Sequence, residues 1–461
     1  MTLIKSISGI RGTIGGPAGE GLTPLDAVKF TAAFTAFIAA SNPDAKRRIV
    51  VGRDARLSGS MIKSLVSATV CGMGYDVIDI DLASTPTTEL AVVGEHAAGG
   101  LILTASHNPR QWNALKLLNS KGEFLNAAEG AEVLAMAEDC EFDFAPVDEI
   151  GHVYTNNTWT EKHIEQVLAL DLVDVDAIRR ADFTVAVDAV NSVGGIAIPK
   201  LLKALGVKKV VELNCTATGD FAHNPEPIPE NLTGISELMA KGGCDLGIVV
   251  DPDVDRLALI CEDGKMFGEE YTLVSVADYV LSHTPGATVS NLSSSRALRD
   301  VTQAHGCTYS ASAVGEVNVT TEMKRTGAVI GGEGNGGVIY PALHYGRDAL
   351  VGVALFLTLL AKSGKKVSEL RKTYPPYEIF KTKVQLTPDI DVDSVLAAVK
   401  DRFADEKVTD IDGVKIDFAD SWVHLRKSNT EPIIRIYAEA HTHQEAEDLA
   451  NRIKEIIDAT I

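Results

Sequence analysis

The chain has 461 residues, which is too many for one hydrophobic core, because cores stop growing at roughly 250–300 residues. We therefore expect three or four domains. Its 63 acidic and 43 basic residues give a formal net charge of −20, which argues against a general binder of nucleic acid or of membrane surfaces, since these need a basic face.

The first residues, Met1 to Ser6, lack the basic segment and the apolar stretch of a secretory signal. No apolar run reaches the roughly 20 residues that a membrane-spanning helix needs. A helical apolar stretch around residues 30–40 is interrupted by Thr31 and Thr35 and is typical of a buried helix. Six cysteines without a C-x-x-C pair favour free thiols in a reducing compartment, so we predict a cytoplasmic protein.

The chain then repeats one pattern three times: a strand, a turn, a helix, a second strand, and an apolar strand that ends in polar residues. In the first copy, a strand at 49–51 precedes a helix at about 61–73 and a strand at 75–80. The apolar segment 101–103 then leads into the polar loop 104–109.

The second copy has strands at 183–187, 210–213 and 246–250, and the last of these leads into residues 251–256. The third copy opens with a strand at 287–289.

In the third copy, an apolar segment at 327–330 leads into the glycine-rich loop 332–337. Such alternation is typical of sheets covered by helices on both faces, and ligands of these sheets bind beyond the carboxyl ends of the strands. Three equivalent strand ends with different polar loops predict one cleft lined by three domains.

The C-terminal part differs, and Pro375-Pro376 indicates a linker before it. We expect a half-buried strand at 380–386, a helix at about 393–403, further strands at 414–416, 422–425 and 433–437, and a final helix from about 444. The predicted fold class is α/β, with three similar α/β domains with mixed sheets and a C-terminal α+β domain around a central active-site cleft. The predicted domains are residues 1–150, 151–252, 253–371 and 372–461.

Asp251, Asp253 and Asp255 directly follow a buried strand. On an extended segment, side chains at alternate positions share one face, where three carboxylates repel unless a cation lies among them. Hard oxygen ligands select Mg²⁺ or Ca²⁺, and the distal Glu and central Gly of a calcium-binding EF-hand loop are absent. The alternative is a polar loop with a capping aspartate.

Ser106 also follows a buried strand, in Thr-Ala-Ser-His-Asn-Pro, which is not the Gly-x-Ser-x-Gly turn of hydrolases. A serine can carry a phosphoryl group where a metal and cationic groups neutralise the charge of the transferring oxygens. Lys116, ten residues later, can then act as a general acid or base or hold charge. In isolation, Ser106 reads as a turn or cap residue and Lys116 as a surface residue.

The glycines of 332–337 would let a ligand approach the backbone, and Glu333 and Asn335 can bind sugar hydroxyls; a plain flexible turn is the alternative. Residues 426–432, with Arg435 beyond them, bring arginines, hydroxyls and an amide together, which suits a non-reacting phosphate. The alternative there is a solvated hairpin loop.

These motifs, in this order, resemble the α-D-phosphohexomutase superfamily, which includes phosphoglucomutase, phosphomannomutase and phosphoglucosamine mutase. The resemblance spans essentially the whole chain and is carried by residues 9–12, 104–109, 251–256, 332–337 and 426–432. It implies four domains in a heart-like arrangement.

The resemblance also implies an isomerase that moves a phosphoryl group within a phosphorylated hexose or hexosamine, through a phosphoserine and a sugar bisphosphate that also serves as activator. One Mg²⁺ per chain would be held by Ser106, Asp251, Asp253 and Asp255. The candidate catalytic residues are Ser106, Lys116, Arg11, His107 and Arg256. The candidate substrate-binding residues are Glu333, Asn335, Arg296, Arg426, Ser428, Asn429, Thr430 and Arg435; for Arg11 and Arg296 a structural role is the alternative.

Substrate preference is open between two readings. Val314-Gly315-Glu316 is similar to phosphoglucosamine mutases, which we favour. The run 331–341 with 346–348 is similar to some bacterial phosphoglucosamine mutases and to archaeal phosphohexomutases. Ser428-Asn429-Thr430 occurs in some phosphomannomutases. Gly337 replaces a histidine common in bacterial relatives, so that role is vacant or passes to another residue such as His344.

Two other classes compete: a metal-dependent sugar phosphatase and a non-catalytic phosphosugar-binding protein. We expect a monomer or a homodimer with no nucleic-acid or membrane partner.

Overall fold

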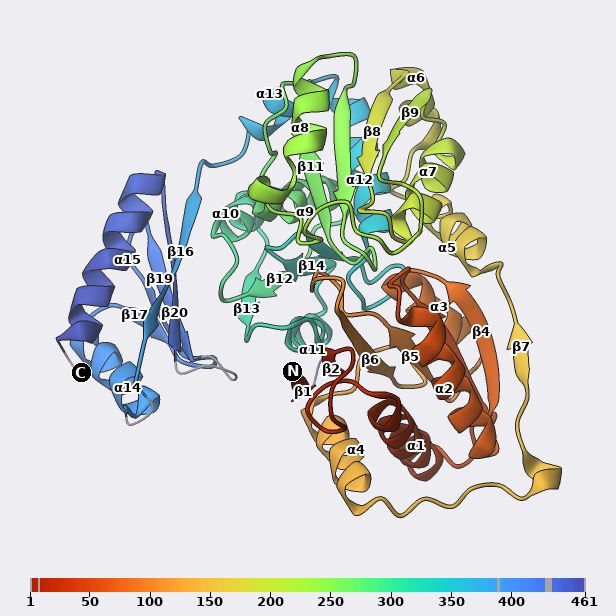
Figure 1. Cartoon of the computed structure of the whole chain (residues 1–461). Coiled ribbons are helices and arrows are strands. Elements are labelled where there is room, and N and C mark those ends of the chain that lie inside the picture. The colour runs from red at the N-terminus through yellow and green to blue at the C-terminus, as the bar shows by residue number, and fades with distance from the viewer. Residues whose placement is uncertain (1, 7–8, 388–389, 428–432, 460–461) are drawn as a thin grey trace. The chain divides into compact units, whose positions relative to one another are not determined.

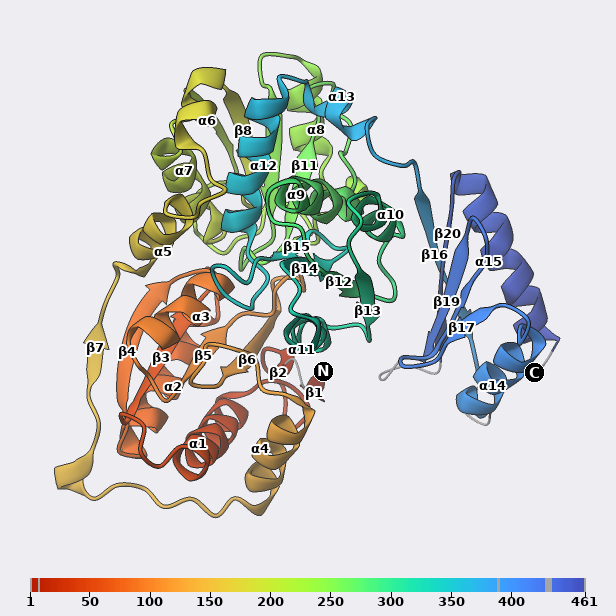
Figure 2. The ribbon, with the colours of Figure 1, turned by 180° about the vertical axis from the view of Figure 1, so that it is seen from behind.

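The structure is a computed structural model that describes residues 2–6, 9–387, 390–427 and 433–459. The chain forms two compact units, residues 1–272 with 335–370 and residues 273–334 with 371–461. Figures 1 and 2 show the ribbon from opposite sides. Among the described residues, no helix combines the length and the hydropathy of a membrane span.

The N-terminal sheet of the first unit has seven strands in the order β1-β2-β6-β5-β3-β4-β7. Helices cover both of its faces, with α1, α2 and α4 on one side and α3 on the other (Figure 1), so its central strands β3, β5 and β6 are largely buried. The sheet is mixed, because β6 runs antiparallel to β5 while β3, β4 and β5 are parallel. The bounds are β1 (Leu3–Ser6), β2 (Gly9–Thr13), α1 (Pro24–Ser41), β3 (Arg48–Arg53), α2 (Gly59–Gly72), β4 (Asp76–Leu82), α3 (Thr85–Gly94), β5 (Gly99–Leu103), β6 (Trp112–Leu118), α4 (Ala127–Asp139) and β7 (Val153–Thr155).

The second sheet has the order β11-β10-β8-β9, which repeats β6-β5-β3-β4 of the first sheet in both order and strand direction. Two copies of the predicted repeat therefore share one topology. Helix α8 packs on β8, β10 and β11, and α7 packs on β8 and β9. The bounds are α5 (Trp159–Leu168), α6 (Val175–Ala181), β8 (Thr184–Asp188), α7 (Gly194–Ala204), β9 (Lys209–Leu213), α8 (Thr233–Ala240), β10 (Leu246–Val250) and β11 (Leu257–Ile260).

Helix α12 (Ala349–Ser363) completes this domain, although it lies far along the chain. It contacts β11, α5, α6 and α7, and Phe356 meets Phe267 edge to face with ring centroids 5.2 Å apart. Figure 2 shows α12 among the elements of the second sheet. The short strand β15 (Gly337–Ile339) belongs to the same unit.

The second unit begins with a parallel sheet in the order β13-β12-β14, the same order as β4-β3-β5. The strand predicted at 327–330 in fact begins at Ile330, because α11 continues to Thr326 and Gly327 ends it with φ 63°. The bounds are α9 (Glu269–His283), which begins in the first unit, β12 (Thr288–Asn291), α10 (Ala297–Ala304), β13 (Tyr309–Ser312), α11 (Glu316–Thr326) and β14 (Ile330–Glu333). Helix α13 (Val367–Arg371) lies in the first unit except for Arg371.

The C-terminal domain is an antiparallel sheet in the order β16-β20-β19-β18-β17, covered on one face by α14 and α15. Side chains alternate along each strand, so Val423 and Leu425 join the core beneath the helices while Trp422 and His424 lie on the opposite face. Strand β17 was not predicted, since three residues are too few to show a period. The bounds are β16 (Glu378–Gln385), α14 (Val392–Arg402), β17 (Lys407–Thr409), β18 (Val414–Asp417), β19 (Trp422–Lys427), β20 (Ile433–Ala440) and α15 (His443–Asp458).

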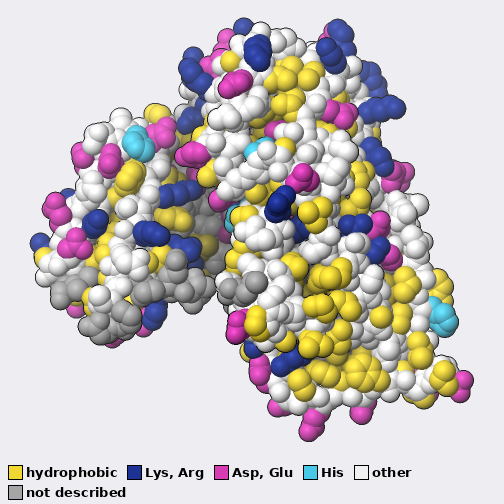
Figure 3. All heavy atoms as spheres, in the orientation of Figure 1, with side chains coloured by type: hydrophobic (Ala, Val, Ile, Leu, Met, Phe, Trp, Pro, Cys, Tyr) yellow, Lys and Arg dark blue, Asp and Glu magenta, His cyan; other side chains and the backbone are white. Residues whose placement is uncertain are grey.

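The negative charge of the chain is not gathered in one place on the face that Figure 3 shows. Acidic and basic side chains are interspersed there among uncharged ones. All six cysteines are free thiols, as the sequence predicted.

Candidate active site

The Ser106 hydroxyl lies where the loops after β5 and β10 meet. It donates a hydrogen bond to Asp251 Oδ2 at 2.7 Å, and the serine is only 8% exposed. Its backbone has φ 47°, a left-handed conformation that is uncommon outside glycine. The Ser106 amide donates to Thr104 Oγ1, whose hydroxyl donates to the buried Asp54. This chain of bonds fixes the serine in a strained turn.

Arg56 holds the same loop in place. Its side chain is fully buried, and its Nε lies 2.9 Å from Asp54 Oδ2. The guanidinium donates hydrogen bonds to four backbone carbonyls, those of Ser106, Asn108, Pro109 and Trp112. Because the five donors of arginine are rigidly arranged, one side chain sets the path of this loop. Sequence reasoning missed Arg56, although it lies just after the polar end of β3.

Asp251, Asp253 and Asp255 converge, with one carboxylate oxygen from each lying within 4.8 Å of the others, and all three are buried. The predicted reason for this was wrong. The segment is a turn rather than extended backbone, and Val254 has φ 63°. For a β-branched residue this conformation is a genuine outlier, of the kind that clusters at functional sites.

The donor set fits a hard divalent cation. Asp253 Oδ1 and Asp255 Oδ1 are buried and have no hydrogen-bond partner among the described residues, which is costly unless a cation is bound there. Burial raises the pKa of Asp251, and the carboxylates of Asp255 and Asp253 raise it further. The three residues and Ser106 therefore form a candidate metal site.

Lys116, on β6, and Thr85, at the start of α3, also contact this cluster. Lys116 Nζ lies 2.7 Å from Asp253 Oδ2 and 3.6 Å from Asp255 Oδ2. Burial alone would lower the pKa of Lys116, but the two carboxylates outweigh it, so the pKa lies above its ordinary value. The Thr85 hydroxyl donates to Asp253 Oδ2 at 2.7 Å, a contact that the sequence did not indicate.

Arg347 occupies the space beside Gly337. Its Nη2 donates to Asp255 Oδ2 at 2.7 Å, and a Cβ added to Gly337 would lie 2.3 Å from Arg347 Cδ. A histidine at position 337 would therefore collide with Arg347. His344 is bound elsewhere, with its Nδ1 3.1 Å from Glu89 Oε2.

The other three candidate catalytic residues lie around Ser106. His107 Nδ1 is 3.4 Å from Ser106 Oγ, and burial with the nearby Arg256 cation lowers the pKa of His107 to about 2. The Arg256 amide donates to Asp251 Oδ1 at 3.1 Å. Arg11 Nη1 lies 3.5 Å from Asn108 Oδ1, and burial and Arg256 lower the pKa of Arg11. Arg11 and Arg256 thus bring two cations to this part of the site.

The candidate sugar-binding residues divide between the two units. In the second unit, Glu333 is buried and its Oε1 accepts hydrogen bonds from Asn291 Nδ2 at 2.8 Å and from the Gly315 amide at 3.1 Å. In the first unit, Asn335 Oδ1 accepts from the Gly337 amide at 3.2 Å.

The candidate phosphate-binding residues lie in the second unit. Arg426 Nε is 3.0 Å from Asp412 Oδ2, and Arg435 is exposed on β20, directly opposite Arg426 in the strand register. Ser428, Asn429 and Thr430 lie outside the described residues. Arg296 is buried, and it donates to the carbonyls of Phe418 and Ala419.

Comparison with known proteins gives four family models that together match most of the chain. They are the α/β/α domains I, II and III of phosphoglucomutase/phosphomannomutase, at residues 3–143, 161–264 and 268–377, and the C-terminal domain of that family, at 382–456.

Similar whole proteins agree with this. A phosphoglucomutase/phosphomannomutase of Thermococcus kodakarensis is 37% identical over 95% of this chain and 96% of its own length. A probable phosphoglucosamine mutase of Methanopyrus kandleri is 31% identical over 98% of this chain and 96% of its own. A solved structure of a phosphoglucomutase/phosphomannomutase family protein from Burkholderia thailandensis superposes with a TM-score of 0.85 at 24% identity, covering 99% and 98% of the two chains.

Proposed function

The chain belongs to the phosphoglucomutase/phosphomannomutase family of phosphohexomutases, enzymes that move a phosphoryl group between two positions of one sugar. We propose that in this chain Ser106 carries the phosphoryl group. The observation that carries this proposal is the hydrogen bond from the Ser106 hydroxyl to Asp251, inside a buried cluster of three aspartates and a lysine. Burying so many charged groups costs free energy, and such clusters are typical of functional sites.

The reaction would proceed in two transfers. First, the phosphorus–oxygen bond of phosphoserine 106 breaks as the free hydroxyl of the sugar phosphate bonds to phosphorus and loses its proton, which gives a sugar bisphosphate. Then Ser106 Oγ takes the other phosphoryl group, and the sugar oxygen that is left regains a proton. We assign the proton transfers to Lys116, whose pKa a cation held by Asp253 and Asp255 would lower, and the stabilisation of the transferring oxygens to Arg11 and Arg256.

Asp251, Asp253 and Asp255, with an oxygen of the phosphoserine, would hold one Mg²⁺, which neutralises negative charge on the transferring group. The donor chemistry supports magnesium, since all the ligands are hard oxygens. A sugar bisphosphate would prime the enzyme by phosphorylating Ser106.

The preferred substrate that we propose is a hexosamine phosphate, on the motif at 314–316 and on the names of several relatives that are 31% identical. A phosphoglucomutase/phosphomannomutase is the second candidate, because the 37% identical relative bears that name.

The test is a coupled mutase assay with Mg²⁺ and a trace of hexose 1,6-bisphosphate. It compares glucosamine 6-phosphate, glucose 1-phosphate and mannose 1-phosphate. We expect Ser106→Ala to lower kcat at least about a thousandfold. The matched control is Ser64→Ala, since Ser64 lies on α2 and its hydroxyl donates to the carbonyl of Ser60 in the same helix. Intact mass spectrometry should show one phosphoryl group on wild type and none on Ser106→Ala.

The two other classes give different results in this assay. A phosphatase would release free phosphate without needing the bisphosphate, and a binding protein would bind the sugar phosphate equally well after Ser106→Ala and show no turnover. Full activity of Ser106→Ala would refute the phosphoserine mechanism.

A further inference from the structure

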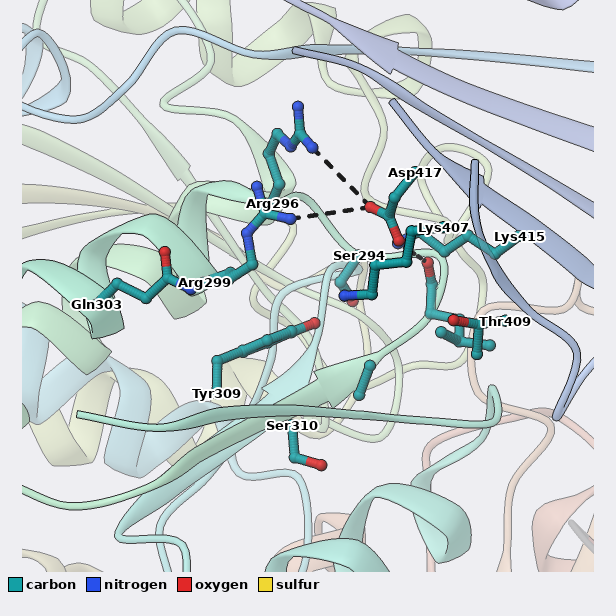
Figure 4. A pocket seen from close by; sticks show the side chains of 12 residues that line it. Ser294, Arg296, Arg299, Gln303, Tyr309, Ser310, Lys407, Thr409, Lys415 and Asp417 are labelled. Carbon is teal, nitrogen blue, oxygen red and sulfur yellow. Dashed lines mark hydrogen bonds and ion pairs between the residues drawn. The ribbon is translucent and has the colours of Figure 1, made fainter. Parts of the chain in front are cut away.

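The second unit contains a cavity of about 330 Å³, and Arg296 is the one candidate substrate-binding residue in its lining. One wall is formed by the end of β12, α10 and β13, and the other by β17 and β18 of the C-terminal sheet (Figure 4). Ligand pockets in proteins begin at about this volume. It is therefore large enough for a small organic molecule.

Four of the lining residues are cations, namely Arg296, Arg299, Lys407 and Lys415, and only one, Asp417, is an acid. This imbalance is opposite to the net charge of −20 of the whole chain. Ser294, Gln303, Tyr309 and Thr409 add polar groups to the lining, whereas the Ser310 hydroxyl points away and donates to Glu322 (Figure 4).

The side-chain alternation of the C-terminal sheet explains how the cations reach the cavity. Val414 and Ile416 of β18 pack beneath the helices, so Lys415 and Asp417 lie on the opposite face. On β17, Val408 packs against the same core, which directs Lys407 to the cavity side. Figure 4 shows the Lys407 and Tyr309 side chains pointing into the cavity.

Carboxylates neutralise these cations only in part. The guanidinium groups of Arg296 and Arg299 lie 3.9 and 3.8 Å from Asp417, longer than hydrogen bonds. Arg299 also bonds to Asp300 at 3.2 Å, outside the lining. The Arg296 Nε is buried with no hydrogen-bond partner among the described residues.

Lys415 is a buried cation of the cavity. Its ammonium donates to the carbonyl of Leu292 at 2.7 Å and lies 4.1 Å above the Trp422 ring. A carbonyl satisfies one of its three donors and carries no full charge. Burial lowers the pKa of Lys415 to about 8, and although Asp417 and Glu439 oppose this, the cation is poorly stabilised by the protein alone. The same burial raises the pKa of Glu439.

We propose that this cavity is an anion-binding site for a small phosphorylated molecule, with a lining that does not include the candidate phosphate-binding residues Arg426 and Arg435. Phosphate oxygens would accept hydrogen bonds from Arg299, Lys407 and Lys415, which supply the charge that carboxylates do not. A bound anion would join the segments 292–311 and 407–417, and so stabilise the packing of the C-terminal sheet on the domain that precedes it.

The test uses the full-length enzyme labelled with 5-fluorotryptophan. The chain has three tryptophans, and Trp422 is assigned through Trp422→Phe. Because the Lys415 ammonium lies over the Trp422 ring, an anion bound there changes the fluorine resonance of Trp422. Inorganic phosphate and glucose 1,6-bisphosphate are titrated separately, and we expect a saturable shift with at least one of them.

The decisive variant is Arg299→Gln with Lys407→Gln, because both side chains are partly exposed and neither belongs to the catalytic machinery. We expect it to weaken binding at least tenfold, while mutase activity and the far-ultraviolet spectrum stay those of wild type. Lys400→Gln is the matched control, since Lys400 is a similarly exposed lysine of the same domain that pairs with Asp410. The single variant Lys407→Arg keeps the positive charge and Arg299, so it should bind the anion as wild type does.

The two probes identify the source of the phosphate. Equal midpoints indicate free phosphate as the ligand, and a much lower midpoint for the bisphosphate indicates an organic phosphate. The proposal is overturned if neither probe gives a saturable shift, or if the shift is unchanged in the double variant.

Discussion

Arg56 shows how much of the candidate site depends on a residue that touches no reacting group in the proposed mechanism. The ion pair with Asp54 is fully buried, and the same guanidinium binds the four carbonyls that shape the Ser106 loop. Burial raises the pKa of Asp54, which indicates that its charge depends on Arg56.

Replacing Arg56 by Met should therefore destabilise the protein by about 3–5 kcal/mol, because the carboxylate of Asp54 is left buried and unpaired. Urea unfolding measures this. Arg110→Met is the matched control, since Arg110 forms an exposed ion pair with Asp220 and should cost under about 1 kcal/mol. Equal losses in the two variants would contradict the supporting role of Arg56.

Gly337 and Arg347 give a second prediction at this scale. Gly337→Ala places a Cβ against the Arg347 side chain, which then has to leave Asp255. Loss of such a supporting contact typically weakens metal affinity by about 10–100-fold. We expect the Mg²⁺ concentration for half-maximal mutase activity to rise by at least about tenfold.

Gly234→Ala is the control for this change, because a Cβ there meets nothing within 4 Å. In an Arg347→Ala background, Gly337→Ala should add little, since the colliding side chain is gone. If the two changes instead add fully, the effect of Gly337→Ala does not act through Arg347.

At the scale of elements, a buried polar network joins α3, α5 and the start of α12. Asp348 caps α12 and binds both His163 Nε2, at 2.8 Å, and His344 Nε2, at 3.2 Å, while Glu89 of α3 binds the other nitrogen of His344. His163 Nδ1 in turn contacts Thr87 Oγ1 at 2.9 Å. The network ties together elements that are distant in sequence.

This network should make stability depend on pH. Burial alone would lower the pKa of His344, but Asp348 and Glu89 outweigh it and raise the pKa to about 10. Between roughly pH 6.5 and 10 the folded chain thus holds a proton that the unfolded chain has lost, so stability is fully present below that range and decreases as pH rises.

From pH 7 to 9 the loss at this site should be roughly 2 kcal/mol in urea unfolding, and His344→Gln should flatten the dependence. His152→Gln is the control, because His152 is largely exposed. An unchanged pH profile in His344→Gln would show that other groups cause the dependence.

The elements also show what the sequence could predict. The loops that carry Ser106 and Asp251 could be predicted, because each follows an apolar run that stops at polar residues. The turn at Val254 could not be predicted, because the positive φ of this β-branched residue is imposed by its surroundings and not by its own conformational preference. Arg56, Thr85 and Arg347 were missed as site residues because their contacts cross between distant segments.

At the scale of the whole molecule, the C-terminal domain has its own core. All of its core residues lie between Val384 and Ile457, beneath α14 and α15. We expect the fragment from residue 372 onward to fold alone, with a cooperative thermal transition by circular dichroism. Its tryptophan emission should be red-shifted, because Trp422 is fully buried on the sheet face away from α14 and α15, and its partner Glu439 loses the Arg296 amide. A fragment without a cooperative transition would show that this core is insufficient.

The domain boundaries predicted at 150, 252 and 371 stay predictions, while the fold class is confirmed by the repeated sheet order and by the four family matches. The position of α12 could not be predicted, because its uniform apolarity shows that it is buried but not against which sheet.

That position of α12 has a consequence during synthesis on the ribosome. The second sheet is complete in sequence at Ile260, yet the helix that covers part of it ends at Ser363. At translation rates of about 5–20 residues per second, the nascent domain waits roughly 5–20 s with that apolar surface uncovered. We therefore expect chaperones that bind nascent chains to bind the second domain during this interval. Slowly translated codons between Ile260 and Ser363 would prolong the exposure of its apolar surface.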